Sequence, residues 1–426
     1  MDWKLSDLPA YESGRLIPTL FRCGSGMASD LNGPTDEECE MHLVRETSEE
    51  EFIAYCEALI QAGFACVWQN DAETGLFREF RGATSVYAYY IRSEHTARII
   101  VDRASTPLPE FDGASDASVH DDTSMMQFGL YYSDMIHGYT CDCGMMYVFR
   151  LRNNEVVIVD GGEREQCTEP ATEEFMKRLL ALTDNPEKIT VAAWFCTHAH
   201  DDHMDFFGRI LKKYGDRIDV KRAMFNFPSY PYFGGMNESW RSTERMRKRL
   251  KEMYPEIRYL KLHTGQKFRI ANAEFEVLLT HEDILGLHPV RDIYEGMNET
   301  STIMRITFDG ASVILLGDAH VSNGNVLIGR YGPQGLRCTF LQAAHHCINN
   351  VENIYSLIRT DNMLIPECRF VILRSLYDNY RVIERYCPER NIHVAGDATS
   401  VFHISGGAIR TEYFPVVGRP YDGSEI

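Results

Sequence analysis

The stretch THAHDDH, residues 197–203, places three histidines and two aspartates within seven consecutive positions, directly after the apolar run 191–196. His198 and His200 are two apart, so on an extended chain both imidazoles project to the same side. Asp202 and His203 can point back toward them from the turn that follows. Imidazole and carboxylate groups gathered at a strand end are typical ligands of zinc and similar divalent ions. The spacing predicts a metal site, and the alternative is a set of histidines satisfied by hydrogen bonds alone.

The elements that must position this motif alternate between strands and helices. Residues 145–151 and 155–160 have the apolar pattern of two strands, and the second ends at Asp160. A helix is expected over about 171–182, where apolar residues share one face. The next strand leads into the motif, and strands dominate again from 267 to 318. This order predicts sheets covered by helices.

Residues 1–118 have the pattern of a separate α+β module. Ser48 and Glu51 form a capping box that predicts the start of an amphipathic helix, and Gly63 ends it. Alternating apolar residues then predict strands over 64–70, 84–92 and 96–103. A helix on a small antiparallel sheet is therefore expected.

The segment 104–122 is rich in Pro, Ser, Asp and Gly, which is typical of a linker. It predicts a domain boundary at 118/119, with the metal site in residues 119–426. The module before the boundary carries no residues at catalytic spacing. We expect a packing, substrate-lid or dimerisation role for it, and a homo-oligomer through this module is one consequence.

The composition excludes several broad classes of protein. The formal charge of −19, from 62 acidic and 43 basic residues, argues against general nucleic-acid binding, because Lys and Arg hold phosphate backbones. No stretch reaches the ~18 uninterrupted apolar residues of a membrane helix, and the first residues lack the order of a secretion signal. The twelve cysteines follow no regular frame, and Cys141 and Cys143 have no second pair to complete a zinc site. We expect a soluble, cytoplasmic protein with reduced thiols and a small-molecule substrate.

Four landmarks occur in a defined order along the chain. They are VVIVDGG at 156–162, the motif at 198–203, ASVILLGDAH at 311–320 and FLQAAHHCINN at 340–350. Together they resemble the metallo-β-lactamase superfamily, whose signature is His-x-His-x-Asp-His. That family often ends its last loop in His-His-Gly, and this chain has Cys347 in place of the glycine. The resemblance covers about 145–405 and implies an α/β fold, the αββα four-layer sandwich, with the N-terminal module as an extension.

The resemblance also implies two divalent metal ions, with zinc as the first choice and manganese or iron as alternatives. One ion would be held by His198, His200 and His281, the other by Asp202, His203 and His345, with Asp318 shared. His346 is the alternative to His345, and His263 and His288 are the alternatives to His281. Asp160 would hold a ligand histidine. For His320, two residues past Asp318, a structural role and a contact with substrate or a transferred proton are the two alternatives.

Asn298 and Ser301 fit a turn found in the branch of the superfamily that includes the DNA-uptake channel proteins and phosphorylcholine esterases. In that branch the third histidine of the first metal is not dependable. One full and one weaker metal position are therefore expected as a second possibility.

The implied activity is that of a metal-dependent hydrolase in which a hydroxide bridging the two metals attacks the substrate, with catalytic roles for Asp202 and Asp318. A phosphodiester or phosphocholine-type ester is the expected substrate class. The alternatives are a lactone or other acyl ester, and a non-hydrolytic di-iron redox protein or sensor. Tyr230, Tyr232 and Phe233 could wall the substrate pocket, and Arg241 begins a basic helix that is either solvated or recognises phosphate.

Overall fold

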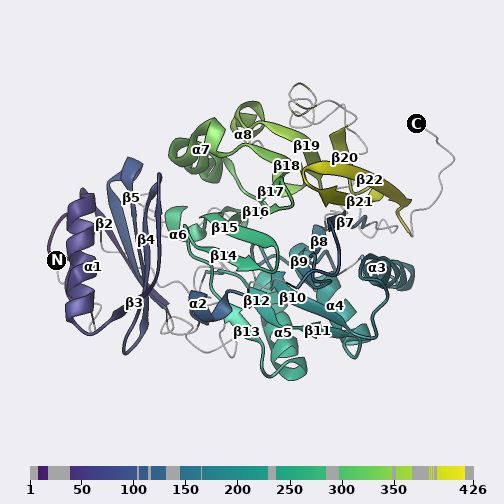
Figure 1. Ribbon diagram of the computed structural model, residues 1–426, viewed down its shortest axis with the longest axis horizontal. Coiled ribbons are helices and arrows are strands. Elements are labelled where there is room, and N and C mark those ends of the chain that lie inside the picture. The colour runs from purple at the N-terminus through teal and green to yellow at the C-terminus, as the bar shows by residue number, and fades with distance from the viewer. Residues whose placement is uncertain are drawn as a thin grey trace.

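The computed structural model of the protein describes residues 8–17, 39–102, 105–113, 117–130, 144–164, 166–228, 237–284, 297–347, 352–366, 383, 385, 387 and 391–417. Three separate sheets organise these residues (Figure 1). Among the helices that they form, none combines the length and apolar character needed to cross a membrane.

The N-terminal sheet has six strands in the order β1-β2-β6-β5-β4-β3 and carries helix α1 (Glu49–Gln61) on one face. Its strands are β1 (Arg15–Ile17), β2 (Cys39–Arg45), β3 (Ala65–Ala72), β4 (Gly75–Arg81), β5 (Ser85–Ile91) and β6 (Thr96–Asp102). The capping box at Ser48 and Glu51 is present, so the predicted helix start is confirmed. Phe52 and Leu59 are buried against the sheet and hold the helix in place.

Two larger sheets face each other in the remainder of the chain. The first has the order β13-β12-β10-β9-β8-β7-β21-β22, with β11 beside β10, and the second has the order β14-β15-β16-β17-β18-β19-β20. The first contains β7 (Thr123–Gln127), β8 (Met146–Arg150), β9 (Val156–Asp160), β10 (Ile189–Phe195), β11 (Ile218–Val220), β12 (Arg222–Met224), β13 (Arg258–Leu260), β21 (Ala398–Ser405) and β22 (Ala408–Pro415). The second contains β14 (Lys267–Ile270), β15 (Ala273–Leu279), β16 (Ile303–Phe308), β17 (Ala311–Leu315), β18 (Cys338–Gln342), β19 (Thr360–Ile365) and β20 (Ile392–Val394).

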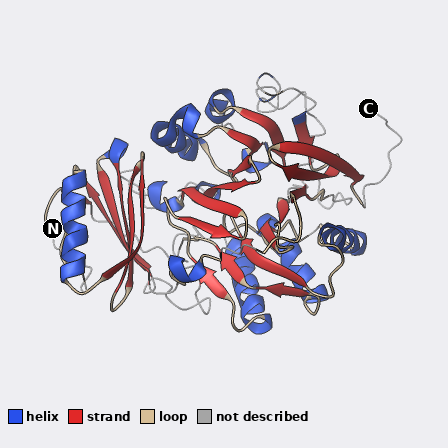
Figure 2. Ribbon diagram, viewed as in Figure 1, coloured by secondary structure: helices blue, strands red, loops and turns tan. Residues whose placement is uncertain are grey.

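Helices cover the outer face of each large sheet, with strands between them (Figure 2). The first sheet packs against α3 (Glu169–Leu182), α4 (Asp205–Tyr214) and α5 (Asn237–Met253), and the second against α7 (Val321–Gly335) and α8 (Glu352–Leu357). A third apolar core, which includes Phe195, Phe275 and Phe340, lies between the sheets. These four layers, with the α+β module before them, confirm the predicted αββα sandwich with an N-terminal extension.

The segment predicted as a linker is packed against the sandwich. It contains α2 (Leu108–Phe111), whose Leu108 and Phe111 are both buried in the core between the two large sheets. Gly113 forms a bridge to Ile270 at the edge of the second sheet. Apolar anchors of this kind restrain the connection between the module and the sandwich. The boundary at 118/119 stays a prediction.

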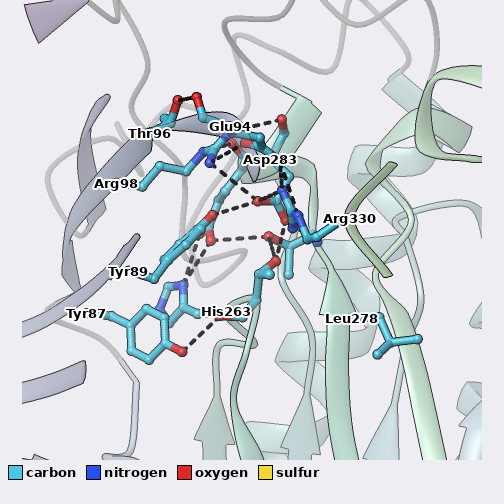
Figure 3. A network of polar contacts seen from close by, with 12 residues as sticks. Tyr87, Tyr89, Glu94, Thr96, Arg98, His263, Leu278, Asp283 and Arg330 are labelled. Atoms are coloured by element: carbon cyan, nitrogen blue, oxygen red, sulfur yellow. Dashed lines mark hydrogen bonds and ion pairs between the residues drawn. The ribbon is translucent and has the colours of Figure 1, made fainter. Parts of the chain in front are cut away.

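The second face of the N-terminal sheet meets the sandwich through buried charges (Figure 3). Arg98 donates to the carbonyl oxygen of Asp283 at 3.2 Å. The Asp283 carboxylate accepts from Tyr89 at 3.0 Å and from Arg330 at 3.1 Å. Arg330 also pairs with Glu94 at 2.5 Å. We call these five residues the interface network.

A histidine extends this contact along the same sheet. The ring of His263 stacks on that of Tyr87, with centroids 4.7 Å apart, and Tyr87 donates to the carbonyl of Thr264 at 2.9 Å. His263 lies between two carboxylates, 3.1 Å from Glu282 and 3.3 Å from Asp102. Burial alone would lower the pKa of His263, but the two acids raise it to about 10. His263 is thus held as a cation that joins the N-terminal module to the sandwich.

Candidate metal centre

The residues predicted to do chemistry lie on loops that follow neighbouring parallel strands. β9 and β10 are parallel neighbours in the first sheet, and β17 and β18 are parallel neighbours in the second. Asp160 ends β9, the 198–203 motif follows β10, Asp318 follows β17, and the two histidines 345–346 follow β18. Because the carboxyl ends of parallel strands share one edge, this topology brings four distant segments together.

Six side chains form two overlapping groups around Asp318. Asp202, His203, Asp318 and His346 form one group, and His198, His200 and Asp318 form the other. Within each group, one nitrogen or oxygen of every member lies within 4.8 Å of the others. Asp318 Oδ1 is 3.3 Å from His203 Nε2, and Asp318 Oδ2 is 3.7 Å from His198 Nε2. The carboxylate of Asp318 thus connects two adjacent sets of donors.

Several donor atoms of this centre are buried and have no hydrogen-bond partner. They are Nε2 of His200 and of His203, both ring nitrogens of His346, and Oδ1 of Asp318. Leaving a buried polar atom unsatisfied costs about 1–3 kcal/mol, so a folded chain seldom keeps several together without a ligand. Imidazole nitrogens and carboxylate oxygens at this separation fit divalent cations. The residues present are therefore a suitable donor set for a binuclear metal site.

The buried acids and histidines of the centre shift one another's pKa. Burial alone would raise the pKa of Asp202 and of Asp318, but His203 and His346 hold both well below the ordinary value. Burial would lower the pKa of the two histidines. Asp318 and Asp202 instead raise the pKa of His346 to about 9. The same two acids, together with Asp160, raise the pKa of His203 well above its ordinary value. In the metal-free chain, protons on two imidazoles balance the carboxylates. Divalent ions would compete with those protons.

Asp160 holds the motif without belonging to either group. Its carboxylate accepts from the Thr197 amide at 2.7 Å and the Thr197 hydroxyl at 2.9 Å. Its Oδ2 also lies 2.7 Å from His203 Nδ1. In the neutral, metal-binding form of the ring, this contact assigns the proton to Nδ1 and leaves Nε2 directed at Asp318. The residue has a positive φ of 55°, which turns the chain sharply after β9.

Asp318 is positioned by a close approach of two loops. Its backbone amide donates to the Ser301 hydroxyl at 3.0 Å. The preceding Gly317 has a φ of 56°, and a β-carbon there would lie 2.9 Å from Ser301 Oγ. A side chain at 317 would therefore push the two loops apart and displace the shared carboxylate.

A family comparison agrees with this geometry. The model of the metallo-beta-lactamase superfamily matches residues 141–353, half of the chain. The chain belongs to the metallo-beta-lactamase superfamily. The general activity expected of such a chain is that of a metal-dependent hydrolase. A comparison with curated proteins gave no match.

Solved structures of the superfamily are among the similar folds. The metallo-beta-lactamase fold protein YhfI from Bacillus subtilis is 12% identical, with a TM-score of 0.38, over 68% of this chain and 100% of that chain. A diphosphatase of the PhnP family is 14% identical, with a TM-score of 0.36, over 64% of this chain and 94% of that one. CmlA, a diiron beta-hydroxylase from Streptomyces venezuelae, is 16% identical, with a TM-score of 0.27, over 53% of this chain and 35% of that one. Similarities this low carry no information about substrate.

Of the two candidate histidines, the structure places His346, and not His345, in a group around Asp318. His346 is 1% exposed, and its Nε2 lies 3.2 Å from Asp202 and 3.5 Å from Asp318. The His345 side chain is 22% exposed, and its Nε2 lies 3.8 Å from the Asp318 carboxylate and 3.2 Å from the side-chain amide nitrogen of Asn298. Both histidines and Cys347 have positive φ, so the turn directs the second ring inward. The family's glycine is consistent with such a backbone.

His281, the predicted third histidine of the first ion, lies outside both groups. It begins α6 (His281–Ile284), and its Nε2 is 2.8 Å from the Asn226 side chain. Burial lowers its pKa to about 3. The alternative His263 belongs to the contact with the N-terminal module, and His288 lies outside the described residues. In the part of the chain that the structure describes, the group of His198 and His200 therefore has only Asp318 as a third member.

Neither His320 nor Arg241 belongs to either group around Asp318. His320 precedes α7, with its ring centroid 5.7 Å from that of His345. Arg241 is exposed on α5. Tyr230, Tyr232 and Phe233 lie outside the described residues.

Two supporting residues were missed at the level of sequence. Thr197 bridges Asp160 and the ring of His198, whose Nδ1 is 3.1 Å from the threonine hydroxyl. The Tyr355 hydroxyl accepts a hydrogen bond from the backbone amide of Ala344 at 2.8 Å and so supports the turn that carries His346. The position of Thr197 next to the motif was a usable signal. Tyr355 had none, because its contact depends on the packing of α8.

Proposed function

We propose that the protein is a hydrolase with two divalent metal ions, preferably zinc. Asp202, His203 and His346 would hold one ion, His198 and His200 the other, and Asp318 would contact both. The observation that carries the proposal is the set of buried nitrogens and oxygens without hydrogen-bond partners around Asp318. Three protein ligands against four make the His198–His200 position the weaker one.

The residues around the donors suggest how a bond would be cleaved. When bound, two divalent ions would lower the pKa of a water toward neutrality and stabilise negative charge on the oxygen of the bond under attack. Asp202 is 16% exposed, against 1% for Asp318, so its carboxylate is the one placed to orient the water and take its proton. His345 lies beside Asp318 on the more exposed side, where it can donate a hydrogen bond to a substrate oxygen.

The finer proposal is a phosphodiester or related phosphate ester as substrate. A phosphoryl group presents several anionic oxygens, and two adjacent cation positions suit such a group. We also propose a cytoplasmic location, in line with the reduced thiols of Cys56, Cys66, Cys196 and Cys338. A homo-oligomer through the N-terminal module stays a prediction.

A substrate panel tests the proposed activity. Chromogenic phosphodiesters, phosphomonoesters, lactones and carboxylic esters are assayed with zinc or manganese, using wild type, His346→Ala and the control His42→Ala in β2. We expect phosphodiester cleavage that His346→Ala reduces by roughly a hundredfold or more and that His42→Ala leaves unchanged. Cleavage of carboxylic esters or lactones alone would reject the phosphate ester. Two bound irons with no hydrolysis of any substrate would reject the hydrolase.

A further inference from the structure

We propose that a basic cavity between α4 and α5 binds the phosphate group of a small-molecule ligand. The cavity has a volume of about 240 Å³ and is distinct from the donors around Asp318. Its cationic lining comes from three segments of the chain. Arg164 precedes α3, Arg209 and Lys212 lie on α4, and Arg245 and Arg249 lie on α5. We call the hollow that these five side chains line the basic cavity.

The local charge opposes that of the molecule as a whole. The chain carries a formal charge of −19, yet Asp205 is the one acidic residue that lines the cavity. Asp205 is already engaged with Arg245 at 2.8 Å. Arg164, Arg209 and Lys212 form no ion pair with another described residue. A concentration of cations in a hollow attracts anions and raises their local concentration.

The helices are arranged so that their cations converge. Arg209 and Lys212 lie three apart on α4, and Arg245 and Arg249 lie four apart on α5, so each pair shares a helix face. Arg249 donates to the carbonyl of Gly208, and a β-carbon at 208 would lie 3.3 Å from the Arg249 guanidinium. The glycine thus lets the two helices approach closely enough for both faces to line one hollow.

The mutual repulsion of the cations favours an anionic ligand. Burial lowers the pKa of Arg249, and the nearby Arg209 and Arg245 lower it further, against an opposing contribution from Asp205. A bound dianion would relieve this repulsion. Guanidinium groups recognise phosphate through pairs of parallel hydrogen bonds, which a lone ammonium group cannot match.

The apolar part of the lining limits the size and kind of ligand. Met204 and Met246 are 1% and 4% exposed and border the same hollow as the cations. Flexible thioether side chains adapt to irregular apolar groups. The cavity is slightly smaller than typical small-ligand pockets of roughly 300–1,000 Å³. A small phosphate-bearing organic molecule fits it better than an extended polymer does.

The cavity is connected to the signature motif through the backbone. Met204 and Asp205 follow His203 directly in the chain. The phosphate could therefore belong to the substrate itself or to a separate effector whose binding restrains the motif. Both sources share the same recognition chemistry, and kinetics distinguish them.

Binding of pyrophosphate to the full chain tests the site. Isothermal titration calorimetry is performed on the metal-loaded protein and again after its metal has been removed with a chelator. Chelation should abolish pyrophosphate binding at the metal centre and leave binding in the basic cavity intact. We expect Arg209→Gln/Lys212→Gln to weaken binding by the chelated protein at least about tenfold. The matched control Lys248→Gln/Lys251→Gln, on the neighbouring helix α5 but outside the cavity, removes the same charge and should leave binding unchanged.

Equal loss in both double variants, or no binding by the chelated wild type at millimolar pyrophosphate, would overturn the proposal whatever the metal centre does. A raised KM with unchanged kcat in Arg209→Gln/Lys212→Gln would identify the ligand as substrate. An unchanged KM, with pyrophosphate altering the rate of wild type but not of the variant, would identify a separate effector.

Discussion

The protein has two buried groups of charged side chains that differ in how their polar atoms are satisfied. In the interface network, the Asp283 carboxylate accepts from Tyr89, Thr264 and Arg330, and Arg98 donates to two carbonyl groups (Figure 3). Of the atoms of the interface network, Arg330 Nη1 alone is buried without a hydrogen-bond partner, whereas four imidazole nitrogens and one carboxylate oxygen of the candidate metal centre are. Cations and anions alternate in the first group, whereas histidines surround the acids in the second.

The comparison teaches that buried charge alone does not identify a functional site. A group whose donors and acceptors are nearly all matched holds two parts of a fold together, and removing one member exposes the others to an uncompensated burial cost. A group with unmatched donors is instead prepared for a ligand. The two regions should therefore respond in opposite ways to mutation: the metal centre in metal content, the interface network in stability.

The largest effect is expected for Asp318→Asn, which removes the carboxylate shared by both groups. kcat/KM should fall by roughly a thousandfold or more, because both ions lose a ligand and the cleavage step loses its charge stabilisation. Elemental analysis of the purified protein should show less than the wild-type metal content. Wild-type metal content in this variant would separate Asp318 from the centre.

Arg330→Met should produce the opposite pattern. It leaves the buried Asp283 and the partly exposed Glu94 with fewer partners, so the free energy of unfolding should fall by about 3–5 kcal/mol. Metal content should stay at the wild-type level. Denaturant unfolding followed by tryptophan fluorescence measures the change, with the exposed Arg337→Met at the end of the same helix as the control. A loss of metal without a loss of stability would reverse the roles assigned to the two groups.

Asp160→Asn should have an intermediate effect on the metal centre. The amide would still contact Thr197 but would hold the His203 ring less firmly in the required tautomer. Metal affinity should fall by about 10- to 100-fold. Competition with a fluorescent chelator measures it, and an affinity equal to that of wild type would show that His203 needs no such support.

The pH dependence of stability sharpens the account of the interface. The pKa of His263 is about 10 in the fold, above its ordinary value of 6.5, so its contribution is fully present below pH 6.5 and is lost as the pH rises toward 10. The slope from this group is at most about 1.4 kcal/mol per pH unit. Denaturant unfolding at pH 6.5, 8 and 9.5 should show a steeper decline for wild type than for His263→Gln. Parallel declines would mean that His263 is neutral in the fold.

The sequence was informative where function depends on neighbouring residues. The spacing of His198, His200, Asp202 and His203 predicted a cluster that the structure brings together, and the apolar strand before Asp318 predicted the delivery of a carboxylate to it. The first feature depends on strand geometry, which is visible in a single sequence, and the second was implied by the resemblance to the superfamily.

Other features depend on contacts that no local pattern reveals. The choice of His346 over His345 follows from a left-handed turn at both residues, and the position of His281 follows from its contact with Asn226, 55 residues earlier. Arg98 and Asp283 are 185 residues apart, so nothing near either one indicated their contact. Leu108 and Phe111 are buried although they lie in a segment with the composition of a linker.

Metal stoichiometry of three single variants tests the central claim most directly. His346→Ala, His345→Ala and His281→Ala are loaded with zinc, freed of excess ion and measured by mass spectrometry under native conditions. The account predicts two ions in wild type, in His345→Ala and in His281→Ala, and loss of at least one ion in His346→Ala. Two ions in His346→Ala together with a loss in His281→Ala would contradict the ligand set drawn from the structure.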